Sequence, residues 1–520
     1  METTQAIETW TVTKPAVSGT NGLVASQHYL ASDIGARVLA EGGNAVDAAL
    51  AASVAIGTVE PWMSGLGGGG YMLVYSAAED RTQAIDFGMV APRALDPADY
   101  PLVEGTGPDL FAWPSVVEDR NLQGPHSIAV PGFVAGLALA HERFATRSWA
   151  ETLAPAIALA ERGMTVDWYA SFKIASDAAL LTRHDESRRV YLPGGFPPVG
   201  EWGRSPPGIR LGKLAATLAR LAEAGAGDFY RGEIARALVA DAQALGSRLA
   251  ADDLADYAAH IGPASAAAYR DATVHGAPGL TAGPTLDHAL AMLASDLAPP
   301  ADIDAETYAA YARALRVAYA HRFATMGDAS AEGPVPTCTT HLSVVDRDGN
   351  MVALTQTLLS LFGSKVMLPE TGIMMNNGIM WFDPRPGRPN SIGPGKRPLS
   401  NMCPTILARA DGGRVALGAS GGRRIMPAVM QLISFLVDFG MDLDAAFHTP
   451  RLDVSGGDEI TLDNRVDAAT VAAVAKEGPV AVEQHAVYPA LFACPNAVAS
   501  GSTQTGAAFV MSPWAKVSAA

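Results

Sequence analysis

Hydroxyl side chains that could do nucleophilic chemistry gather between Thr339 and Thr357. Two runs rich in β-branched residues flank an Asp348-Gly349 step, which is a strong hairpin signal. If these two residues form the loop, Thr340 lies opposite Thr357, whereas a three-residue loop shifts the pairing by one position. In either register the Thr357 hydroxyl lies within about one residue of the Thr339–Thr340 pair.

A threonine hydroxyl is a weak nucleophile until a base takes its proton. In one known arrangement the threonine is the first residue of a chain, and its own α-amine, with a pKa of about 7.7 to 8.0, is the base. Thr339 is internal as encoded, so this chemistry requires cleavage before it. The alternative is that these threonines simply pack well on a pleated surface, and the stretch alone favours that alternative.

Two glycine-rich segments are the other candidates for chemistry. Gly421-Gly422 precede a predicted helix that begins near Ile425, and such a turn presents free backbone N–H groups to an oxyanion or another anion. An ordinary strand-to-helix turn is the alternative. The run 64–70 lacks the Gly-Lys-Ser/Thr ending of a phosphate-binding loop. We expect its backbone to turn sharply or to pass close to another segment.

The elements that must position these residues follow from periodicity and capping signals. Asn44 is a good N-cap, and Pro155 predicts a kink or a break in the helix that contains it. An aromatic stripe from Tyr308 to Phe323 predicts core packing rather than a cofactor site. We expect strands at 22–27, 71–75 and 405–408, and helices at 29–41, 45–58, 133–144, 149–162, 213–224, 233–245 and 304–325.

The amino-acid composition limits the classes to which this protein can belong. The chain has 520 residues, of which 49% are hydrophobic and 17% charged, and its net charge is −16. These values predict a globular protein and argue against a nucleic-acid partner, because binding phosphates requires clustered Lys and Arg. The apolar stretches 48–59 and 425–437 are too short or too polar to cross a bilayer. We expect buried helices there and no membrane association.

The N-terminus and the cysteines indicate the compartment. Acidic residues stand where a secretory signal would carry bases, and an apolar core segment is lacking, so we expect a cytoplasmic protein. Cys338, Cys403 and Cys494 are an odd number at wide spacing, which argues against a disulfide framework or a zinc cluster. No cofactor and no metal site is predicted.

Seven segments together resemble the γ-glutamyltransferase (γ-glutamyl transpeptidase) family, in the order in which they occur there, and the resemblance covers nearly the whole chain. They are 41–49, 64–70, 130–132, 155–163, 339–341, 394–400 and 421–422.

The resemblance implies an α+β fold, the four-layer αββα sandwich of N-terminal-nucleophile hydrolases. It also implies a precursor that cleaves itself between Cys338 and Thr339, giving a large subunit of residues 1–338 and a small subunit of residues 339–520 within one structural domain. The active form would be a heterodimer of these subunits, with further oligomerisation left open.

The resemblance also implies roles for single residues. Thr339 corresponds to the nucleophile, Thr357 to the threonine that hydrogen-bonds it, and Gly421 and Gly422 to the oxyanion-hole pair. Substrate-binding positions are Ser400, Asn401, Arg423 and Trp381. Cys338 offers a rival nucleophile if cleavage occurs one bond earlier, although the match of 339–341 to the family argues against it.

This sequence departs from the family at residues that read the glutamyl head group. Gly88 stands where arginine is expected, Leu359 where asparagine is expected, and Gly378 where glutamine is usual. Trp381 replaces an aspartate, Asn401 replaces a serine, and 280–284 replaces a Pro-Ser-Ser-Gly type of segment. A zwitterionic glutamyl group would leave charges unpaired in such a pocket, which costs several kcal/mol.

These departures favour an amide hydrolase or acyltransferase with a non-glutamyl or altered acyl group, suited to Trp381 and Leu359, with Arg423 holding a carboxylate placed differently. A true glutathione hydrolase or γ-glutamyl transpeptidase is the alternative, if Asp383 or Arg423 compensates. A non-catalytic, unprocessed scaffold is a third hypothesis. The small-molecule partner is an amide or γ-glutamyl compound.

Overall fold

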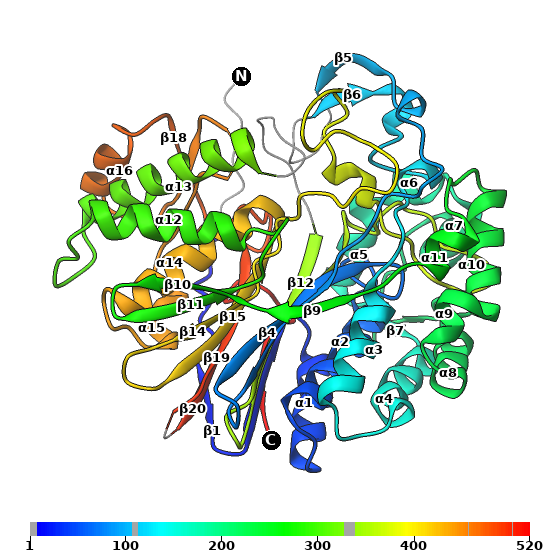
Figure 1. Ribbon diagram of the computed structural model, residues 1–520, viewed down its shortest axis with the longest axis horizontal. Coiled ribbons are helices and arrows are strands. Elements are labelled where there is room, and N and C mark those ends of the chain that lie inside the picture. The colour runs from blue at the N-terminus through cyan, green and yellow to red at the C-terminus, as the bar shows by residue number, and fades with distance from the viewer. Residues whose placement is uncertain (1–7, 107–112, 327–337, 456, 502) are drawn as a thin grey trace.

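The computed structural model describes residues 8–106, 113–326, 338–455, 457–501 and 503–520. Its centre is a pair of seven-stranded antiparallel sheets packed face to face, with helices on both outer sides (Figure 1). The four-layer αββα arrangement predicted from the family resemblance is confirmed.

One sheet contains the strands that carry both threonines. In spatial order its strands are β21 (Lys516–Ala519), β2 (Gly22–Ser26), β12 (Cys338–Asp346), β13 (Met351–Leu359), β3 (Gly69–Ser76), β4 (Arg81–Phe87) and β9 (His260–Pro263). The other sheet carries the strand before the glycine pair. It contains β1 (Val17–Gly19), β20 (Gln504–Ala508), β19 (Cys494–Ala499), β15 (Arg414–Ser420), β14 (Thr405–Ala408), β11 (Ala272–Gly276) and β10 (Ser265–Tyr269).

Two groups of helices cover the outer faces of the sheets (Figure 1). On the sheet of β12 lie α1 (Tyr29–Ala40), α2 (Ala45–Val59), α3 (Phe133–Phe144), α4 (Trp149–Arg162), α5 (Trp168–Ser176), α6 (Ala178–Leu181), α7 (Asp185–Tyr191), α8 (Leu214–Ala224), α9 (Gly227–Arg231), α10 (Glu233–Ala244) and α11 (Ala251–Ala255). On the sheet of β15 lie α12 (Gly283–Asp296), α13 (Ala305–Thr325), α14 (Ile425–Val437), α15 (Leu443–His448) and α16 (Ala468–Val474).

The remaining strands that the structure describes form smaller sheets outside the two large ones. They are β5 (Leu102–Thr106) with β6 (Pro114–Val116), β7 (Met164–Thr165) with β8 (Gly208–Ile209), and β16 (Leu452–Asp453) with β17 (Ile460–Asp463) and β18 (Val480–Glu483).

Among the described residues, the layers produce three large hydrophobic cores, one under each group of helices and one between the sheets, and a fourth small cluster surrounds Phe509. Strand β12 shows the alternation that this requires: Leu342 and Val344 belong to the core under α2, while Val345 belongs to the core between the sheets. Because side chains alternate along a strand, the odd-numbered residues of β12 face the other sheet. The even-numbered residues face the helices.

The hairpin that joins β12 and β13 has a three-residue loop, so the two-residue alternative is wrong. Thr340 pairs with Gln356 rather than with Thr357. The carboxylate of Asp346 accepts hydrogen bonds from the backbone N–H groups of Asp348 and Asn350, at 3.0 and 2.9 Å. Gly349 takes a left-handed φ of +83°, which suits the last position of such a loop.

The helices predicted from capping and periodicity are confirmed. Asn44 caps α2 by accepting from the N–H groups of Val46 and Asp47, and every residue of that helix is buried. The aromatic stripe of α13 lies in the core. Helix α4 continues through Pro155, so the predicted break does not occur; packing of α4 against α2 and α8 compensates for the one missing N–H.

The run 64–70 requires glycine at several positions, because its backbone passes close to the backbone of other segments. A Cβ on Gly68 would lie 2.3 Å from the carbonyl oxygen of Thr357, and one on Gly67 would lie 2.2 Å from that of Met374. The expectation of a close backbone approach is therefore confirmed. This contact holds the end of β13 against the segment that leads into β3.

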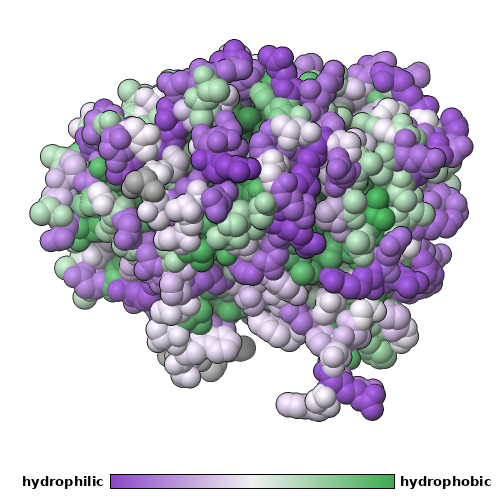
Figure 2. Space-filling model, turned by 90° about the horizontal axis from the view of Figure 1, so that it is seen from below, coloured by the Kyte–Doolittle hydropathy of each residue, from purple (hydrophilic) through white to green (hydrophobic). Residues whose placement is uncertain are grey.

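Among the described residues, no helix is both long and apolar enough to cross a membrane. The apolar stretches at 48–59 and 425–437 are instead buried within α2 and α14. In Figure 2 hydrophilic and hydrophobic residues are interspersed over the face seen from below.

Candidate active site

Thr339 and Thr357 lie together at one end of the central hairpin. The Thr339 hydroxyl donates to Oγ1 of Thr357 across 3.5 Å, and both side chains are almost fully buried. A register shift between Cys338 and Thr340 is the local irregularity that accompanies this contact, since bulges re-aim side chains. The expected meeting of the two hydroxyl groups is thus present.

Leu359 holds the Thr357 hydroxyl from the other side. Its backbone N–H donates to Oγ1 of Thr357 at 2.7 Å. Leu359 has a φ of +91°, a conformation that leucine rarely adopts and that stores strain. Asparagine, the residue expected here from the family resemblance, tolerates a left-handed conformation better than leucine does. The turn therefore holds leucine in a conformation that asparagine would adopt more readily.

Thr340 faces the helical layer and contacts a buried carboxyl group. Its hydroxyl donates to Oε2 of Glu60 across 3.5 Å, and Glu60 is 4% exposed at the end of α2. Burial raises the pKa of Glu60 to about 8, although the charge of Lys173 and the Thr340 hydrogen bond oppose this. A carboxyl group that is largely neutral at pH 7 therefore lies one residue from Thr339.

His341 locks the two sheets together beside these residues. Its ring nitrogens contact the hydroxyl oxygens of Thr355 at 2.8 Å and Ser343 at 3.0 Å. A Cβ on Gly418 would lie 2.4 Å from the imidazole ring, so glycine is required in β15. Burial lowers the pKa of His341 to about 3, and the ring is a neutral structural group.

The turn after β15 presents a pair of glycines at the same end of the sandwich. Gly421 and Gly422 have φ values of +128° and +63°, which side chains disfavour. Among the residues that the structure describes, neither N–H has a hydrogen-bond acceptor. Gln27, which follows β2, donates from Nε2 to Oγ of Ser420. Since Ser26 pairs with Leu342, this bond holds the turn near the start of β12.

The two predicted substrate-binding residues before β14 are fixed by a buried arginine of α13. Arg322 donates from Nη2 to the Ser400 carbonyl at 2.7 Å and to Oδ1 of Asn401 at 3.2 Å, and from Nη1 to the Thr281 carbonyl at 2.9 Å. Arg322 is 1% exposed. Within the described part of the chain, the buried Nδ2 of Asn401 has no acceptor, so it is free to donate to a ligand.

Trp381 and Arg423 lie on the same side of the site. The short helix η5 (Gly378–Trp381) follows Asn377, whose side-chain oxygen accepts from the Ser360 N–H at 3.0 Å. This contact links η5 to the end of β13. The buried Nε1 of Trp381 also has no acceptor among the described residues. The Arg423 guanidinium lies over the rings of Phe323 and Trp113, 4.6 and 5.9 Å from their centres.

The corner at Gly88 has no room for the arginine expected from the family. A Cβ there would lie 2.7 Å from the Tyr71 hydroxyl. The nearby Arg397 is already paired with Asp86 at 3.0 Å, and it also donates to the Gly88 carbonyl. The corner is therefore closed by residues that bind one another.

The carboxylate of Asp383 is likewise already paired with another residue of the protein. Its buried carboxylate accepts from Nε and Nη2 of Arg385, at 2.9 and 2.8 Å, and from the Arg385 backbone N–H. An acid already paired in this way does not replace the aspartate whose position Trp381 occupies.

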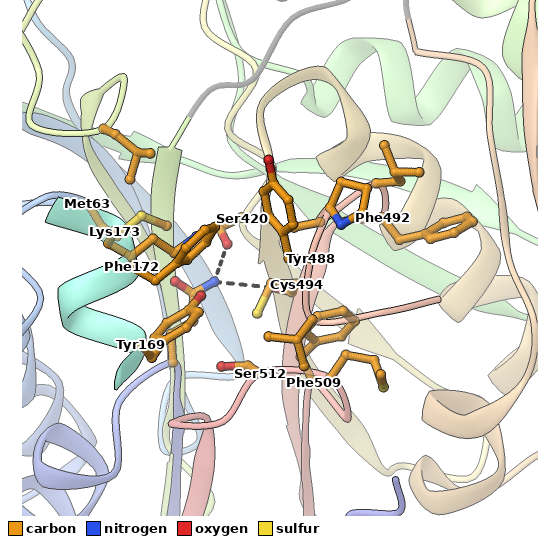
Figure 3. A pocket seen from close by; sticks show the side chains of 18 of the residues that line it. Met63, Tyr169, Phe172, Lys173, Ser420, Tyr488, Phe492, Cys494, Phe509 and Ser512 are labelled. Carbon is orange, nitrogen blue, oxygen red and sulfur yellow. Dashed lines mark hydrogen bonds between the residues drawn. The ribbon is translucent and has the colours of Figure 1, made fainter. Parts of the chain in front are cut away.

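A cavity of about 410 Å³ opens beside Gly421 (Figure 3). None of Ser400, Asn401, Arg423 and Trp381 lines it. Its floor contains the polar side chains of Gln27, Glu60 and Ser420, while its walls are mainly apolar and aromatic. The wall residues include Met63, Tyr169, Phe172, Leu361, Val487, Tyr488, Leu491, Phe492, Phe509 and Met511.

Sequence reasoning missed Glu60, Gln27 and Arg322. Glu60 carried a signal that was available, namely a charged residue at the end of a largely apolar helix, whereas Arg322 is one of several charged residues of α13 and carried none. Such a charge is costly to bury without a role. Gln27 carried no comparable signal. Cys403 is buried, Cys494 is partly buried in the cavity wall, and both thiols are free.

Metal ligation has no support in the described ranges, which contain no group of three or more His, Cys, Asp or Glu side chains that could hold an ion. The hydroxyl pair, the glycine turn and the unpaired N–H donors are suited to acyl transfer through a covalent ester, which needs hydrogen-bond donors for an oxyanion.

Known proteins resemble this chain over most of its length. The family model for gamma-glutamyltranspeptidase matches residues 31–338 and 330–493. The Acylase ACY 1 proenzyme of Pseudomonas sp. (strain SE83) is 32% identical over 538 residues, covering 96% of this chain and 94% of that protein. The Glutathione hydrolase proenzyme of Bacillus subtilis (strain 168) is 31% identical over 490 residues, covering 84% and 81%.

The fold agrees as well. The crystal structure of cephalosporin acylase from Bacillus halodurans superposes with a TM-score of 0.85 over 100% of this chain and 99% of that one, at 24% identity. With a family model that spans most of the sequence and relatives above 30% identity, the chain belongs to the gamma-glutamyltranspeptidase family of enzymes.

Proposed function

We propose that this protein is a self-processing amide hydrolase or acyltransferase in which Thr339, freed by cleavage after Cys338, is the nucleophile, and that its acyl group is not the usual glutamyl group. The observation that carries the catalytic part is the 3.5 Å contact between the Thr339 and Thr357 hydroxyl groups beside the unpaired glycine N–H groups. Two relatives named as proenzymes support the processing step.

Self-cleavage begins when Oγ1 of Thr339 attacks the carbonyl carbon of Cys338. The C–N bond then breaks as the hydroxyl proton passes to the Thr339 nitrogen, leaving an ester between the Cys338 carbonyl and the Thr339 oxygen. Water hydrolyses this ester, which gives a Cys338 carboxylate, a free Thr339 hydroxyl and a free α-amine. The two products are residues 1–338 and 339–520.

Turnover repeats the chemistry on an external amide. The Thr339 amine takes the hydroxyl proton while Oγ1 attacks the substrate carbonyl, and the N–H groups of Gly421 and Gly422 stabilise the oxyanion. The proton goes to the departing amine, so that an acyl ester remains on Thr339. Water or a second amine then cleaves the ester. Thr357 orients the nucleophile, because its own Oγ1 is fixed by the Leu359 N–H at 2.7 Å.

The acyl side of the pocket is the basis for altered specificity. Gly88 supplies no guanidinium, and Asp383 is already paired with Arg385. Nε1 of Trp381 and Nδ2 of Asn401 are instead buried donors without an acceptor among the described residues. They suit a carbonyl or carboxylate oxygen on an acyl group that has an apolar or aromatic body and no ammonium group.

The alternative is a true glutathione hydrolase or transpeptidase. It is favoured by the 31% identity to the Bacillus subtilis relative with that name. Under this alternative, the guanidinium of Arg423 would bind the α-carboxylate of the glutamyl group.

Mass spectrometry of the purified protein under denaturing conditions tests the processing step. Two chains are expected, the second beginning at Thr339, and a single intact chain would contradict the proposal. A panel of γ-glutamyl, glutaryl, oxamyl and aryl-acyl p-nitroanilides tests the specificity. Turnover of the γ-glutamyl compound that matches or exceeds the others would favour the alternative.

A further inference from the structure

The cavity beside Gly421 is not on the acyl side of the site. In its polar floor, Gln27 follows β2, Glu60 follows α2 and Ser420 ends β15, while β19 and the segment after β20 contribute to its walls. Trp381 and Asn401 belong to segments next to β13 and β14, on the opposite side of β12 and β15. The polar floor therefore lies on the β2 side of the start of β12, while Met63 and Leu361 continue the cavity toward the end of β13.

An amide has two halves that leave its carbonyl carbon in different directions. If the acyl half extends from Thr339 toward Trp381 and Asn401, the amine half extends the other way, past Gly421. Gly421 itself lines the cavity, as does Glu60, whose carboxyl group contacts the Thr340 hydroxyl at 3.5 Å. The cavity therefore adjoins one glycine of the pair and the partner of Thr340, although Thr339 itself does not line it.

The floor of the cavity offers a hydrogen-bond acceptor to an N–H group of a ligand. Oε1 of Gln27 is buried and receives no hydrogen bond from a described residue. Nε2 of the same side chain donates to Oγ of Ser420 and to the carbonyl oxygen of Cys494. An unpaired buried acceptor is costly, and an amine or amide N–H would satisfy it. The Glu60 carboxyl group lies in the same floor.

The walls of the cavity are matched to an apolar body. Figure 3 shows Tyr169 and Phe172 on one side and Tyr488, Phe492 and Phe509 on the other, with Ser420 and Cys494 between them. The volume of about 410 Å³ is within the range of small-molecule sites. Lys173 and Arg424 also line the cavity. Their positive charges repel an ammonium ion and so favour binding of the neutral amine. The neutral amine is the form that attacks an ester.

We propose that this cavity binds the amine half of the substrate, either the departing amine of the donor or an acceptor amine, and that it selects amines with an aromatic or extended apolar body. The inference rests on the proposed function, because it requires an acyl ester on Thr339. In acyl transfer the amine nitrogen bonds to the ester carbonyl carbon, the bond from that carbon to the Thr339 oxygen breaks, and the amine proton passes to this oxygen, which restores the hydroxyl.

The test uses the processed protein and one acyl donor that it turns over. Benzylamine and ethylamine are compared as acceptors at equal concentrations of neutral amine, and the ratio of acyl transfer to hydrolysis is measured. The wild type is expected to favour benzylamine by about tenfold or more, since an aromatic ring buried in an apolar pocket adds substantial binding.

Two variants alter the cavity and one is a matched control. Phe172→Ala removes part of the wall, and Ser176→Trp fills space at its edge. Each should reduce the preference for benzylamine by about tenfold. Hydrolysis of the acyl-enzyme by water should stay within about twofold, because water does not need the pocket. Phe196→Ala removes the same ring at a site that is 76% exposed and outside the cavity, and should leave both quantities unchanged.

Two outcomes would overturn the inference, and they are distinguishable. If an acyl-enzyme is detected by intact mass but the amine preference is the same in all variants, the cavity does not bind the amine. If no acyl-enzyme forms, the proposed function itself is wrong and the inference falls with it.

Discussion

The hydroxyl groups of Thr339 and Thr357, which are 18 positions apart in the sequence, lie 3.5 Å from each other at the start of β12. Thr357 accepts both the Thr339 hydroxyl and, at 2.7 Å, the Leu359 N–H. This places the second threonine between a fixed backbone donor and the predicted nucleophile.

Thr357→Val should slow both self-cleavage and turnover by about 10- to 100-fold, because it keeps the shape of the side chain but removes the hydroxyl that we propose orients Thr339. Thr357→Ser retains the hydroxyl and should stay within severalfold of the wild type. A time course of the two chains on a denaturing gel, together with the turnover rate, measures both effects. Equal rates for the two variants would exclude an orienting role.

Gly422→Ala should lower kcat by about a hundredfold, because a side chain at φ +63° displaces the N–H that we propose faces the oxyanion. Gly440 provides a matched control with a φ of +59° and no atom within 4 Å of an added Cβ. Gly440→Ala should cost about 1 kcal/mol of stability and leave kcat unchanged. A comparable loss of kcat in both variants would mean that backbone strain, not the oxyanion site, is responsible.

Trp381→Phe should raise KM for the preferred acyl donor by about tenfold with a smaller change in kcat, because it keeps the ring and removes the unpaired Nε1 donor. Trp149→Phe is the control: it removes an indole N–H that donates to the Leu221 carbonyl at 3.0 Å, in the helical layer. That variant should lose stability only. Steady-state kinetics on one p-nitroanilide separates the two effects, and an unchanged KM in Trp381→Phe would remove this residue from the acyl site.

Glu60→Gln should change how stability depends on pH. Burial raises the pKa of Glu60 to about 8 from an ordinary value of 4.5, so the unfolded chain releases this proton at lower pH than the native one. The stabilisation is complete below about pH 4.5 and is lost as pH rises to about 8, at up to about 1.4 kcal/mol per pH unit.

Thermal unfolding between pH 5 and 8.5 measures this effect, and the midpoint of the wild type should fall relative to that of Glu60→Gln as pH rises. Glu142→Gln, on the exposed side of α3, should follow the wild type. Parallel curves for the wild type and Glu60→Gln would contradict a buried neutral carboxyl group.

Gly68→Ala should destabilise the protein by about 1–3 kcal/mol, because the new Cβ would lie 2.3 Å from the Thr357 carbonyl oxygen. Gly65→Ala is the control in the same run, since its nearest neighbour would be 3.8 Å away. Denaturant unfolding of the two variants should therefore separate them clearly. If they are equally stable, the run is not held by close backbone contact.

Local signals were enough to predict many elements. The Asn44 cap, the aromatic stripe of α13 and the turn before Ile425 are recovered as expected. Each depends on residues within a few positions of one another, where periodicity and capping chemistry dominate. The pairing of the two threonines could also be anticipated to within one residue, because a hairpin joins neighbours in sequence.

The sequence by itself determined which chemical groups are present and which local elements hold them: a threonine-rich hairpin, a glycine turn before a helix, and altered residues at 88, 359 and 381. Only the tertiary structure decided the three-residue loop, the irregularity at 338–340, the burial of Glu60 and Arg322, and the cavity built from segments as far apart as Gln27 and Ser512. These features depend on how two sheets and two helical layers pack, and packing is a sum of long-range contacts that no local pattern encodes.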